Sequence, residues 1–271
     1  MVSFPICKIN LGLHIVGKRN DGYHNLETIF HPIALKDALE IIQADTFSLK
    51  VSGIAVDGDP SKNLCVRAYD LLKQKFGLPP VYMHLHKAIP LGAGLGGGSS
   101  DGAATLLLLN QKFQLKLSPG ELIDLALQLG SDCPFFIINK PCLATGRGEI
   151  MQQVDVSVLK GRKIVIVNPG IHVNTGWAFS QITPTPVGQS LSDIIAQPIS
   201  TWKESLKNDF EEAVFGAHPA IKNIKDELYA QGAAYASMSG SGASVYGIFD
   251  KKNVPDFKFP EHYFVHQSDL S

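Results

Sequence analysis

A glycine-rich segment is the part of the chain whose residue types most clearly suggest chemistry. It reads Ile89-Pro-Leu-Gly-Ala-Gly-Leu-Gly-Gly-Gly-Ser-Ser-Asp101, with five glycines between Gly92 and Gly98. Glycine lets a backbone approach a ligand closely, and a helix beginning at Ser99 directs unpaired N–H groups and the positive end of its dipole at the loop. A phosphate group fits this arrangement best. A flexible turn between strand and helix is the alternative explanation.

Two nucleotide-binding motifs occur in the sequence in incomplete form. Gly92-x-Gly94-x-x-Gly97 satisfies the dinucleotide fingerprint, but a second helix from Ser118 follows, where a βαβ unit needs a strand that ends in an acidic residue. Gly12 to Lys18 reads G-x-x-x-x-G-K, but Arg19 follows in place of Ser or Thr. We therefore expect neither a Rossmann domain nor a Walker P-loop.

A second polar pair lies on the first expected long strand. Alternation places Lys8 and Asn10 on the same face, with the ammonium beside the carboxamide. A lysine in the middle of a largely apolar strand must find a partner or reach water, because burying an unpaired charge is costly. A functional lysine satisfies this condition, and so does one that extends to solvent from an edge strand.

A third polar residue, Asp132, lies between a helix-ending glycine and an apolar run in Leu129-Gly-Ser-Asp-Cys-Pro-Phe-Phe136. This position predicts a carboxylate at a loop edge beside the core, where its surroundings can tune its orientation and pKa. A routine turn aspartate would show the same pattern. Sequence spacing alone does not place Asp132 near Lys8.

Taken together, these segments resemble known motifs. Three segments of the chain resemble the three motifs of the GHMP kinases in order and spacing. They are Cys7-Lys-Ile-Asn-Leu-Gly-Leu13, Pro90 to Asp101, and Met238-Ser-Gly-Ser-Gly-Ala-Ser244. Four shorter segments resemble, within that superfamily, the 4-diphosphocytidyl-2-C-methyl-D-erythritol kinases of non-mevalonate isoprenoid biosynthesis: Lys8-Ile-Asn-Leu-Gly-Leu13, Gly22-Tyr-His24, Gly130-Ser-Asp132 and Asn208-Asp-Phe-Glu211. The resemblance extends from about Cys7 to about Phe249, which is nearly the whole chain.

The resemblance implies a fold and a reaction. The fold is α+β: an N-terminal α+β domain, expected over residues 1–155, and a C-terminal ferredoxin-like α/β domain over residues 156–271, with the active site between them. The reaction is ATP-dependent phosphorylation of the 2-hydroxyl of 4-diphosphocytidyl-2-C-methyl-D-erythritol, which gives the 2-phosphate and ADP. Two alternatives stay open: a GHMP kinase for another small alcohol such as mevalonate or homoserine, and a non-catalytic nucleotide-binding protein of this fold.

The resemblance also implies roles for individual residues. Asp132 would accept or orient the proton of the attacking hydroxyl, Lys8 would keep Asp132 ionised and stabilise the reacting oxygens, and Asn10 would position the same hydroxyl. Ser99 or Ser100 would lie near Mg²⁺, and the resemblance does not identify the ligands of the ion. The residues implied to bind ATP are Pro90, Leu91, Gly92, Ala93, Gly94, Leu95, Gly96, Gly97, Gly98, Ser99, Ser100, Ser239, Gly240, Ser241 and Gly242.

The other end of the implied substrate carries a cytosine. Tyr23 would stack on its face, and His24 would pair with its polar edge. Thr175 would make a polar contact from the opposite wall, where Phe179 or Trp177 supplies a second stacking surface. The sequence departs from the family pattern at Cys7, where alanine is usual, and at Cys133, where a small apolar residue is common, but neither change removes a group that the mechanism needs.

The elements that must position these residues follow from periodicity and turn signals. Mixed strands and helices without regular alternation favour a two-layer α+β architecture over a doubly wound sheet. The polar stretch Gln181 to Ser190 is the candidate joint or exposed loop. The expected strands are 4–16, 24–34, 39–42, 47–52, 81–86, 134–138, 143–145, 164–168, 234–237, 244–249 and 262–266, and the expected helices are 63–76, 99–113, 118–129, 191–196, 202–210 and 220–231.

Composition limits the classes of protein to consider. Of the 271 residues, 45% are apolar and 18% charged, so the chain is not disordered, and a formal net charge of -1 provides no basic field for nucleic acid. No apolar run is long enough for a membrane span, and Lys8 stands where a signal peptide needs its apolar centre. The four scattered cysteines predict reduced thiols. We therefore expect a soluble cytoplasmic protein, whose oligomeric state the sequence does not indicate.

Overall fold

The computed structural model describes residues 1–56, 59–185, 188–251 and 255–270. The chain forms two compact units, each assembled from separate segments. Unit 1 consists of Met1–Cys7, Leu35–Leu91 and Gly96–Lys140, and unit 2 consists of Lys8–Ala34, Gly92–Leu95 and Pro141–Ser271. The glycine-rich segment therefore contributes residues to both units.

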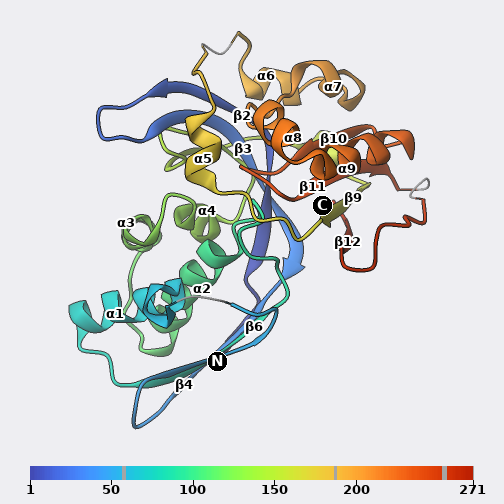
Figure 1. Ribbon diagram of the computed structural model, residues 1–271. Helices are drawn as coiled ribbons and strands as arrows, with labels where there is room; N and C mark the ends of the chain where they lie inside the picture. The colour runs from blue at the N-terminus through green and yellow to red at the C-terminus, as the bar shows by residue number, and fades with distance from the viewer. Residues whose placement is uncertain (57–58, 186–187, 252–254, 271) are drawn as a thin grey trace. The chain divides into compact units, whose positions relative to one another are not determined.

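Unit 1 contains a four-stranded sheet and four α-helices (Figure 1). The strands lie in the order β1-β4-β6-β5, with β4 antiparallel and β5 parallel to β6. The strand β6 ends at Lys87, two residues before the glycine-rich segment begins at Ile89. The elements of unit 1 are β1 (Val2–Ser3), β4 (Ala38–Gln43), β5 (Ser48–Gly53), a 3-10 turn at Pro60–Lys62, α1 (Leu64–Phe76), β6 (Val81–Lys87), α2 (Gly97–Lys112), α3 (Pro119–Leu129) and α4 (Cys133–Ile138).

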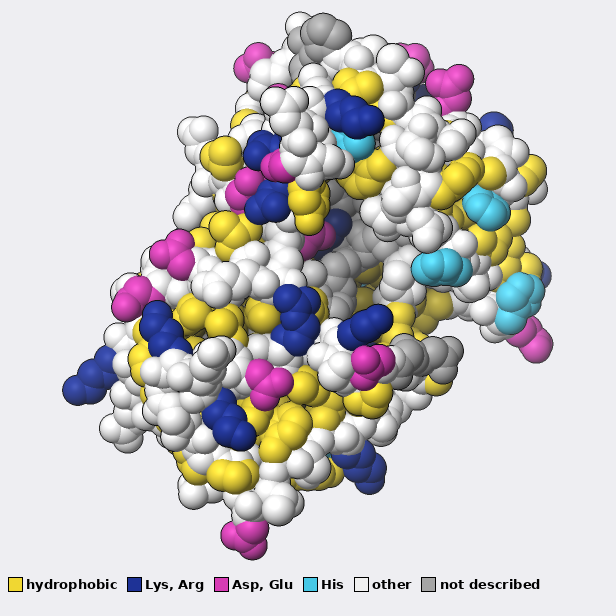
Figure 2. Space-filling model, turned by 60° about the vertical axis from the view of Figure 1, so that its left-hand side comes forward, with side chains coloured by type: hydrophobic (Ala, Val, Ile, Leu, Met, Phe, Trp, Pro, Cys, Tyr) yellow, Lys and Arg dark blue, Asp and Glu magenta, His cyan; other side chains and the backbone are white. Residues whose placement is uncertain are grey.

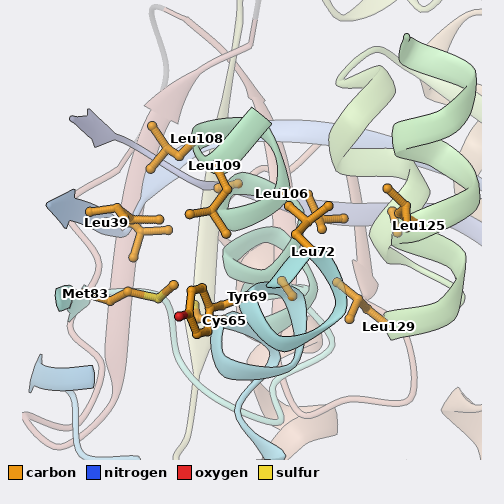
Figure 3. Close-up of a cluster of buried hydrophobic side chains, with 14 of the residues drawn as sticks. Leu39, Cys65, Tyr69, Leu72, Met83, Leu106, Leu108, Leu109, Leu125 and Leu129 are labelled. Carbon is orange, nitrogen blue, oxygen red and sulfur yellow. The ribbon is translucent and has the colours of Figure 1, made fainter. Parts of the chain in front are cut away.

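The core of unit 1 lies between its helices and its sheet (Figure 3). Tyr69 and Leu72 on α1, Leu106 on α2 and Met83 on β6 are fully buried. Burial of each such large apolar side chain contributes about 1.5–3 kcal/mol. This packing fixes α2, whose first turn contains the last two glycines of the segment, Gly97 and Gly98.

Unit 2 contains two four-stranded sheets. In the first, the order is β2-β3-β7-β8, with β3, β7 and β8 joined by antiparallel pairing. Its long strand β2 has its first two residues, Ile6 and Cys7, in unit 1 and carries Lys8 and Asn10 in unit 2. The strands of this sheet are β2 (Ile6–Lys18), β3 (His24–Lys36), β7 (Cys142–Thr145) and β8 (Ile150–Gln153).

The second sheet of unit 2 is antiparallel throughout and has the strand order of a ferredoxin-like domain, β10-β11-β9-β12. Helices α8 and α9 lie against it (Figure 1), and Ile224 and Leu228 of α9 join its buried core. The remaining elements of unit 2 are 3-10 turns at Ser157–Leu159 and Ile199–Thr201, β9 (Arg162–Asn168), α5 (Thr175–Ser180), α6 (Leu191–Ile195), α7 (Trp202–Ser205), α8 (Glu211–Ala217), α9 (Pro219–Ala230), β10 (Tyr235–Met238), β11 (Val245–Asp250) and β12 (Phe264–Asp269).

Local signals explain where several helices begin and end. Asn63 caps α1 by accepting a hydrogen bond from the backbone N–H of Cys65, and Gly77 ends the helix with a φ of 66°. Ser118 and Glu121 form a capping box at the start of α3. These helices were predicted within one or two residues, and the α+β fold class is confirmed.

Other predictions were wrong. Residues 134–138 form part of helix α4 rather than a strand, because Pro134 in the first turn favours a helix start. The helix expected over 202–210 ends at Ser205, and α8 begins at Glu211 as a separate element. Of the expected joint over 181–190, residues 186–187 lie outside the described residues.

The surface of the described residues carries charges of both signs. On the face shown in Figure 2, basic and acidic side chains are interspersed. Within the described part of the chain, no helix combines the length and apolarity that a membrane span requires.

Candidate active site

Lys8 and Asn10 form a buried pair on β2 in unit 2. Their exposed fractions are 4% and 2%. The Lys8 ammonium donates to the Asn10 carboxamide oxygen at 2.6 Å and to the carbonyl oxygen of Gly94 at 3.1 Å, and it lies 5.0 Å from the centre of the Phe30 ring. Lys8 therefore does not extend to solvent, although β2 is an edge strand of its sheet. Its charge is held against the glycine-rich segment.

Hydrogen bonds fix the orientation of the Asn10 carboxamide. Its nitrogen donates to the Thr28 hydroxyl at 2.9 Å, and that hydroxyl donates in turn to the carbonyl of Gly12. This bonding turns the carboxamide oxygen toward Lys8. The Tyr246 hydroxyl also donates to the Asn10 backbone carbonyl at 2.7 Å, which anchors the strand at this residue.

The first glycines of the loop pack directly on the segment Met238–Ser244. The Ser239 hydroxyl donates to the Gly94 carbonyl at 2.9 Å, and the Ser244 N–H donates to the Ala93 carbonyl at 3.2 Å. A Cβ atom on Gly94 would lie 1.9 Å from the Ser239 carbonyl oxygen, and Gly94 has a φ of 75°. Only glycine permits this approach. The structure thus brings Lys8, Asn10, Gly94 and Ser239 together within unit 2.

Two residues that we had assigned no role hold the Met238–Gly240 backbone. Asn208 donates from its side chain to the carbonyls of Met238 and Gly240 at 2.8 and 2.9 Å. Glu211 accepts from the Met238 N–H at 2.9 Å, and its other carboxylate oxygen accepts from Lys225 at 2.6 Å. Both residues belong to the Asn208–Glu211 segment noted in the sequence. The sequence resemblance pointed to this segment, but it did not show which residues Asn208 and Glu211 contact.

The later glycines and Asp132 belong to unit 1. The N-cap of α2 is Gly96, with a φ of 71° and no side chain to accept from the first helical turn. Asp132 is half-buried at the start of α4, and the next residue, Cys133, shares a side-chain hydrogen bond with Ser99 on α2. Burial raises the pKa of the Cys133 thiol to about 11, so it stays protonated. Asp132 is therefore positioned through α4 beside the first turn of α2.

The residues expected to bind cytosine lie around the turn that joins β2 and β3. Tyr23 is 55% exposed, with the Arg147 guanidinium 4.9 Å from its ring centre. The His24 and Phe179 rings stack at 5.0 Å with an interplanar angle of 21°. Trp177, the other aromatic considered, instead contacts His218 edge-on at 6.2 Å. Phe179 is thus the aromatic of α5 that lies beside the Tyr23–His24 turn.

Thr175, another residue predicted to contact the substrate, is the first residue of α5. The Thr175 hydroxyl lies 3.0 Å from the Ser241 hydroxyl, which connects the expected cytosine wall with the Ser239–Gly242 segment.

Among the described residues, no group of three or more His, Cys, Asp or Glu side chains could hold a metal ion. The hard oxygen donors at the start of α2 are the hydroxyls of Ser99 and Ser100, and Ser100 is only 2% exposed.

Comparison with known proteins identifies the family. The model of the GHMP kinases N terminal domain matches residues 63–140, and that of the GHMP kinases C terminal domain matches residues 190–258. The expected domain boundary at residue 155 falls between these two matches and stays a prediction.

Curated relatives match along almost the entire chain. The 4-diphosphocytidyl-2-C-methyl-D-erythritol kinase of Bacteroides fragilis is 52% identical over 100% of both chains, and that of Bacteroides thetaiotaomicron is 53% identical over 96% of this chain and 95% of its own.

Solved structures agree with this assignment. A crystal structure of a 4-(cytidine 5'-diphospho)-2C-methyl-D-erythritol kinase has a TM-score of 0.75 at 30% identity, covering 92% of this chain and 90% of that one. A homoserine kinase from Cytophaga hutchinsonii, at 16% identity, has a TM-score of 0.67 with 98% and 94% covered, which shows a shared fold. From its motifs, its two family matches and its relatives, the chain belongs to the GHMP kinases.

Proposed function

We propose that this protein transfers the γ-phosphate of ATP to the 2-hydroxyl of 4-diphosphocytidyl-2-C-methyl-D-erythritol, giving the 2-phosphate and ADP. The observation that carries the proposal is the buried Lys8, whose ammonium is held by Asn10 and by the Gly94 carbonyl. A protein that only binds nucleotide has no need of a buried cation fixed at the glycine-rich segment. The names of the relatives, at above 50% identity, support the choice of substrate.

The glycine-rich segment would bind the triphosphate. Its backbone N–H groups from Gly92 to Ser99, with those of Gly240 and Ser241, would surround the phosphates, and the uncapped first turn of α2 favours an anion. The N–H groups of Ser100, Ser239 and Gly242 donate to backbone carbonyls instead, so these residues would hold the shape of the site. Mg²⁺ arriving with ATP would neutralise charge on the phosphate oxygens. A serine hydroxyl is a hard oxygen ligand that suits Mg²⁺, and Ser99 or Ser100 would supply it.

At the reacting end, Asp132 would accept the proton of the 2-hydroxyl or orient that hydroxyl. The hydroxyl oxygen then forms a bond to the γ-phosphorus as the bond between this phosphorus and the β,γ-bridging oxygen breaks, and ADP leaves with that oxygen. Lys8 would stabilise the negative charge on the transferring group, and Asn10 would hold the hydroxyl in line. A base of this kind contributes roughly 10²- to 10⁴-fold in rate, and positioning supplies much of the rest.

At the far end, Tyr23 and Phe179 would stack on the cytosine while His24 pairs with its polar edge and Thr175 adds a polar contact. The exposed Tyr23 ring supports this arrangement, since aromatic faces are what a base stacks upon, and the stacking of His24 on Phe179 brings these two residues to the same place. This end of the site would make the enzyme selective for the cytidylated alcohol over mevalonate or homoserine, because those two carry no base.

The test is a coupled assay of ADP release. ATP and Mg²⁺ are supplied with the cytidylated alcohol, with mevalonate, with homoserine or with no acceptor. We expect release with the cytidylated alcohol alone, and release with another acceptor only would refute the proposal. Asp132→Asn should reduce turnover by about 10²-fold or more while ATP still binds. The matched control is Asp124→Asn, which removes an exposed carboxylate on α3 and should leave turnover unchanged.

We also propose that the protein acts in the cytoplasm, where ATP is available. The four cysteines are buried, and their scattered positions lack the close, regular spacing of a secreted disulfide scaffold. Residues 1–155 and 156–271 remain the proposed domains. Fractionation of cells that express a tagged chain tests the location, and recovery of activity in a membrane or periplasmic fraction would contradict it.

A further inference from the structure

A buried charged cluster in unit 1 lies outside the residues given a role above. The Lys87 ammonium donates to a carboxylate oxygen of Asp37 and to Oδ2 of Asp101, the latter at 2.7 Å. Exposed fractions are 1% for Lys87, 1% for Asp37 and 3% for Asp101. Burying three ionisable groups is costly unless the arrangement is well paired, so the cluster needs an explanation.

The place of the cluster in the chain suggests that explanation. Lys87 is the last residue of β6, two residues before the glycine-rich segment begins at Ile89, and Asp101 is the last residue of that segment and lies in α2. The second Asp37 oxygen accepts from the N–H groups of Ala88 and Ile89 at 2.6 and 2.9 Å. The three side chains therefore connect the residues that enter the segment with those that leave it.

The packing above the cluster is tight. A Cβ atom on Gly97 would lie 2.9 Å from Ile89 Cγ2 and 3.3 Å from the Lys87 ammonium nitrogen. Lys87 thus lies directly beneath the first turn of α2. A change in the length or charge of Lys87 would therefore shift the backbone of that turn.

The cluster carries more negative than positive groups. Burial raises the pKa of Asp101 to about 7, although the neighbouring Lys87 acts in the opposite direction. Burial also opposes ionisation of Lys87, but the carboxylates of Asp101 and Asp37 outweigh it and raise the pKa of the lysine. Within the described residues, Oδ1 of Asp101 has no hydrogen-bond partner. Such a cluster is weak evidence for stability but can fix a unique register.

We propose that Lys87, Asp37 and Asp101 are positioning residues that set the separation between the two ends of the glycine-rich segment, and so its fit to the triphosphate of ATP. They act through the backbone of residues 88–101 and do not touch the nucleotide. The inference rests on the proposed function, because it takes ATP as the ligand of that segment.

The test compares three variants with a destabilised control. Lys87→Met and Asp101→Leu should each lower kcat/KM for ATP by about 10- to 100-fold, since small misplacements of binding groups have effects of this size. Asp101→Asn keeps an acceptor for Lys87 and should raise KM for ATP by about threefold. In all three, KM for the alcohol should stay within about twofold. Leu72→Ala, which opens the core of the same unit, should lower the melting temperature and leave both KM values unchanged.

A double-mutant cycle adds a readout that general destabilisation does not give. If Lys87 and Asp101 act as one device, the double variant Lys87→Met, Asp101→Leu should lose little more than either single variant. Fully additive losses, or variants that match Leu72→Ala in stability with unchanged KM for ATP, would overturn the inference. If the two larger changes prevent folding, Asp101→Asn decides: a KM for ATP equal to that of the wild type overturns it.

The dissociation constant for ATP, measured by calorimetry, separates this inference from the proposed function. A wild-type chain that binds ATP but phosphorylates no cytidylated alcohol would refute the proposed function. If Lys87→Met binds ATP more weakly than the wild type, and Asp101→Asn shows a smaller loss of affinity, the positioning role would still be supported. Equal affinity in the wild type and all three variants would refute that role.

Discussion

Acidification should destabilise the fold through His31, a buried residue of β3. Its exposed fraction is 2%. One ring nitrogen, Nδ1, lies 2.8 Å from the Pro32 carbonyl and donates to it, and the other, Nε2, has no partner among the described residues. A proton added at Nε2 would create a buried charge with nothing to compensate it. Burial accordingly lowers the pKa of His31 from 6.5 to about 4.

The sign and size of the effect follow from this shift. The unfolded chain binds the proton at higher pH than the folded chain, so this contribution to stability is present above pH 6.5 and is lost as the pH falls toward 4. The full shift corresponds to about 3.4 kcal/mol, and about 2 kcal/mol is already lost at pH 5. Asp101, whose pKa is raised to about 7, changes in the opposite direction, because its folded form gains stability as the pH falls toward 3.8.

The measurement is the free energy of unfolding in urea at pH 7.5 and pH 5.0. Since Asp101 also titrates, the readout is the difference between proteins. His31→Asn keeps a donor near Pro32 without a titratable ring, so its stability should fall by about 2 kcal/mol less than that of the wild type over this range. The control is His86→Gln, which replaces an exposed histidine on β6. An equal fall in the wild type and His31→Asn would refute the reasoning.

Three further predictions concern the candidate site. Gly94→Ala places a methyl group against the Ser239 carbonyl at a φ of 75°, so kcat/KM for ATP should fall by about 10²-fold in steady-state assays, and full activity would contradict the close approach. Phe179→Ala should raise KM for the cytidylated alcohol about 10-fold, whereas Trp177→Ala should not, and equal effects would argue against stacking on Phe179. Asn208→Ala leaves two buried carbonyls without a donor, so urea unfolding should show a loss of about 2–4 kcal/mol; a loss below about 0.5 kcal/mol would mean that water replaces the side chain.

Local signals in the sequence predicted much of the fold. Helix α1 begins after Asn63 and ends before Gly77, as expected, because capping depends on neighbouring residues alone. The run Pro134 to Ile138 was assigned to the wrong element, since a short apolar run suits a buried strand and a buried helix equally and packing decides between them. The sequence also did not predict that α8 is a separate helix, which begins at Glu211 after the turn at residues 209–210.

The candidate site was predicted unevenly for a related reason. Lys8 and the glycine-rich segment could be proposed from the sequence because a lysine is unusual in the middle of an apolar strand and five glycines in seven residues are unusual even in a loop. The bonds from Asn208 to Met238 and Gly240 cross about thirty residues, and that from Lys87 to Asp37 crosses fifty. No periodicity or turn signal reports pairings over such separations, so these residues gained a role only from the structure.

The contact between Gly94 and the Ser239 carbonyl has a consequence for inhibitor design. A compound that lies against this backbone would press on atoms that every functional variant must keep, because any larger residue at Gly94 collides with a main-chain oxygen. Resistance through substitution at this residue would therefore disable the protein along with the drug's binding surface. Resistance would have to come from substitution of more exposed side chains, such as Tyr23.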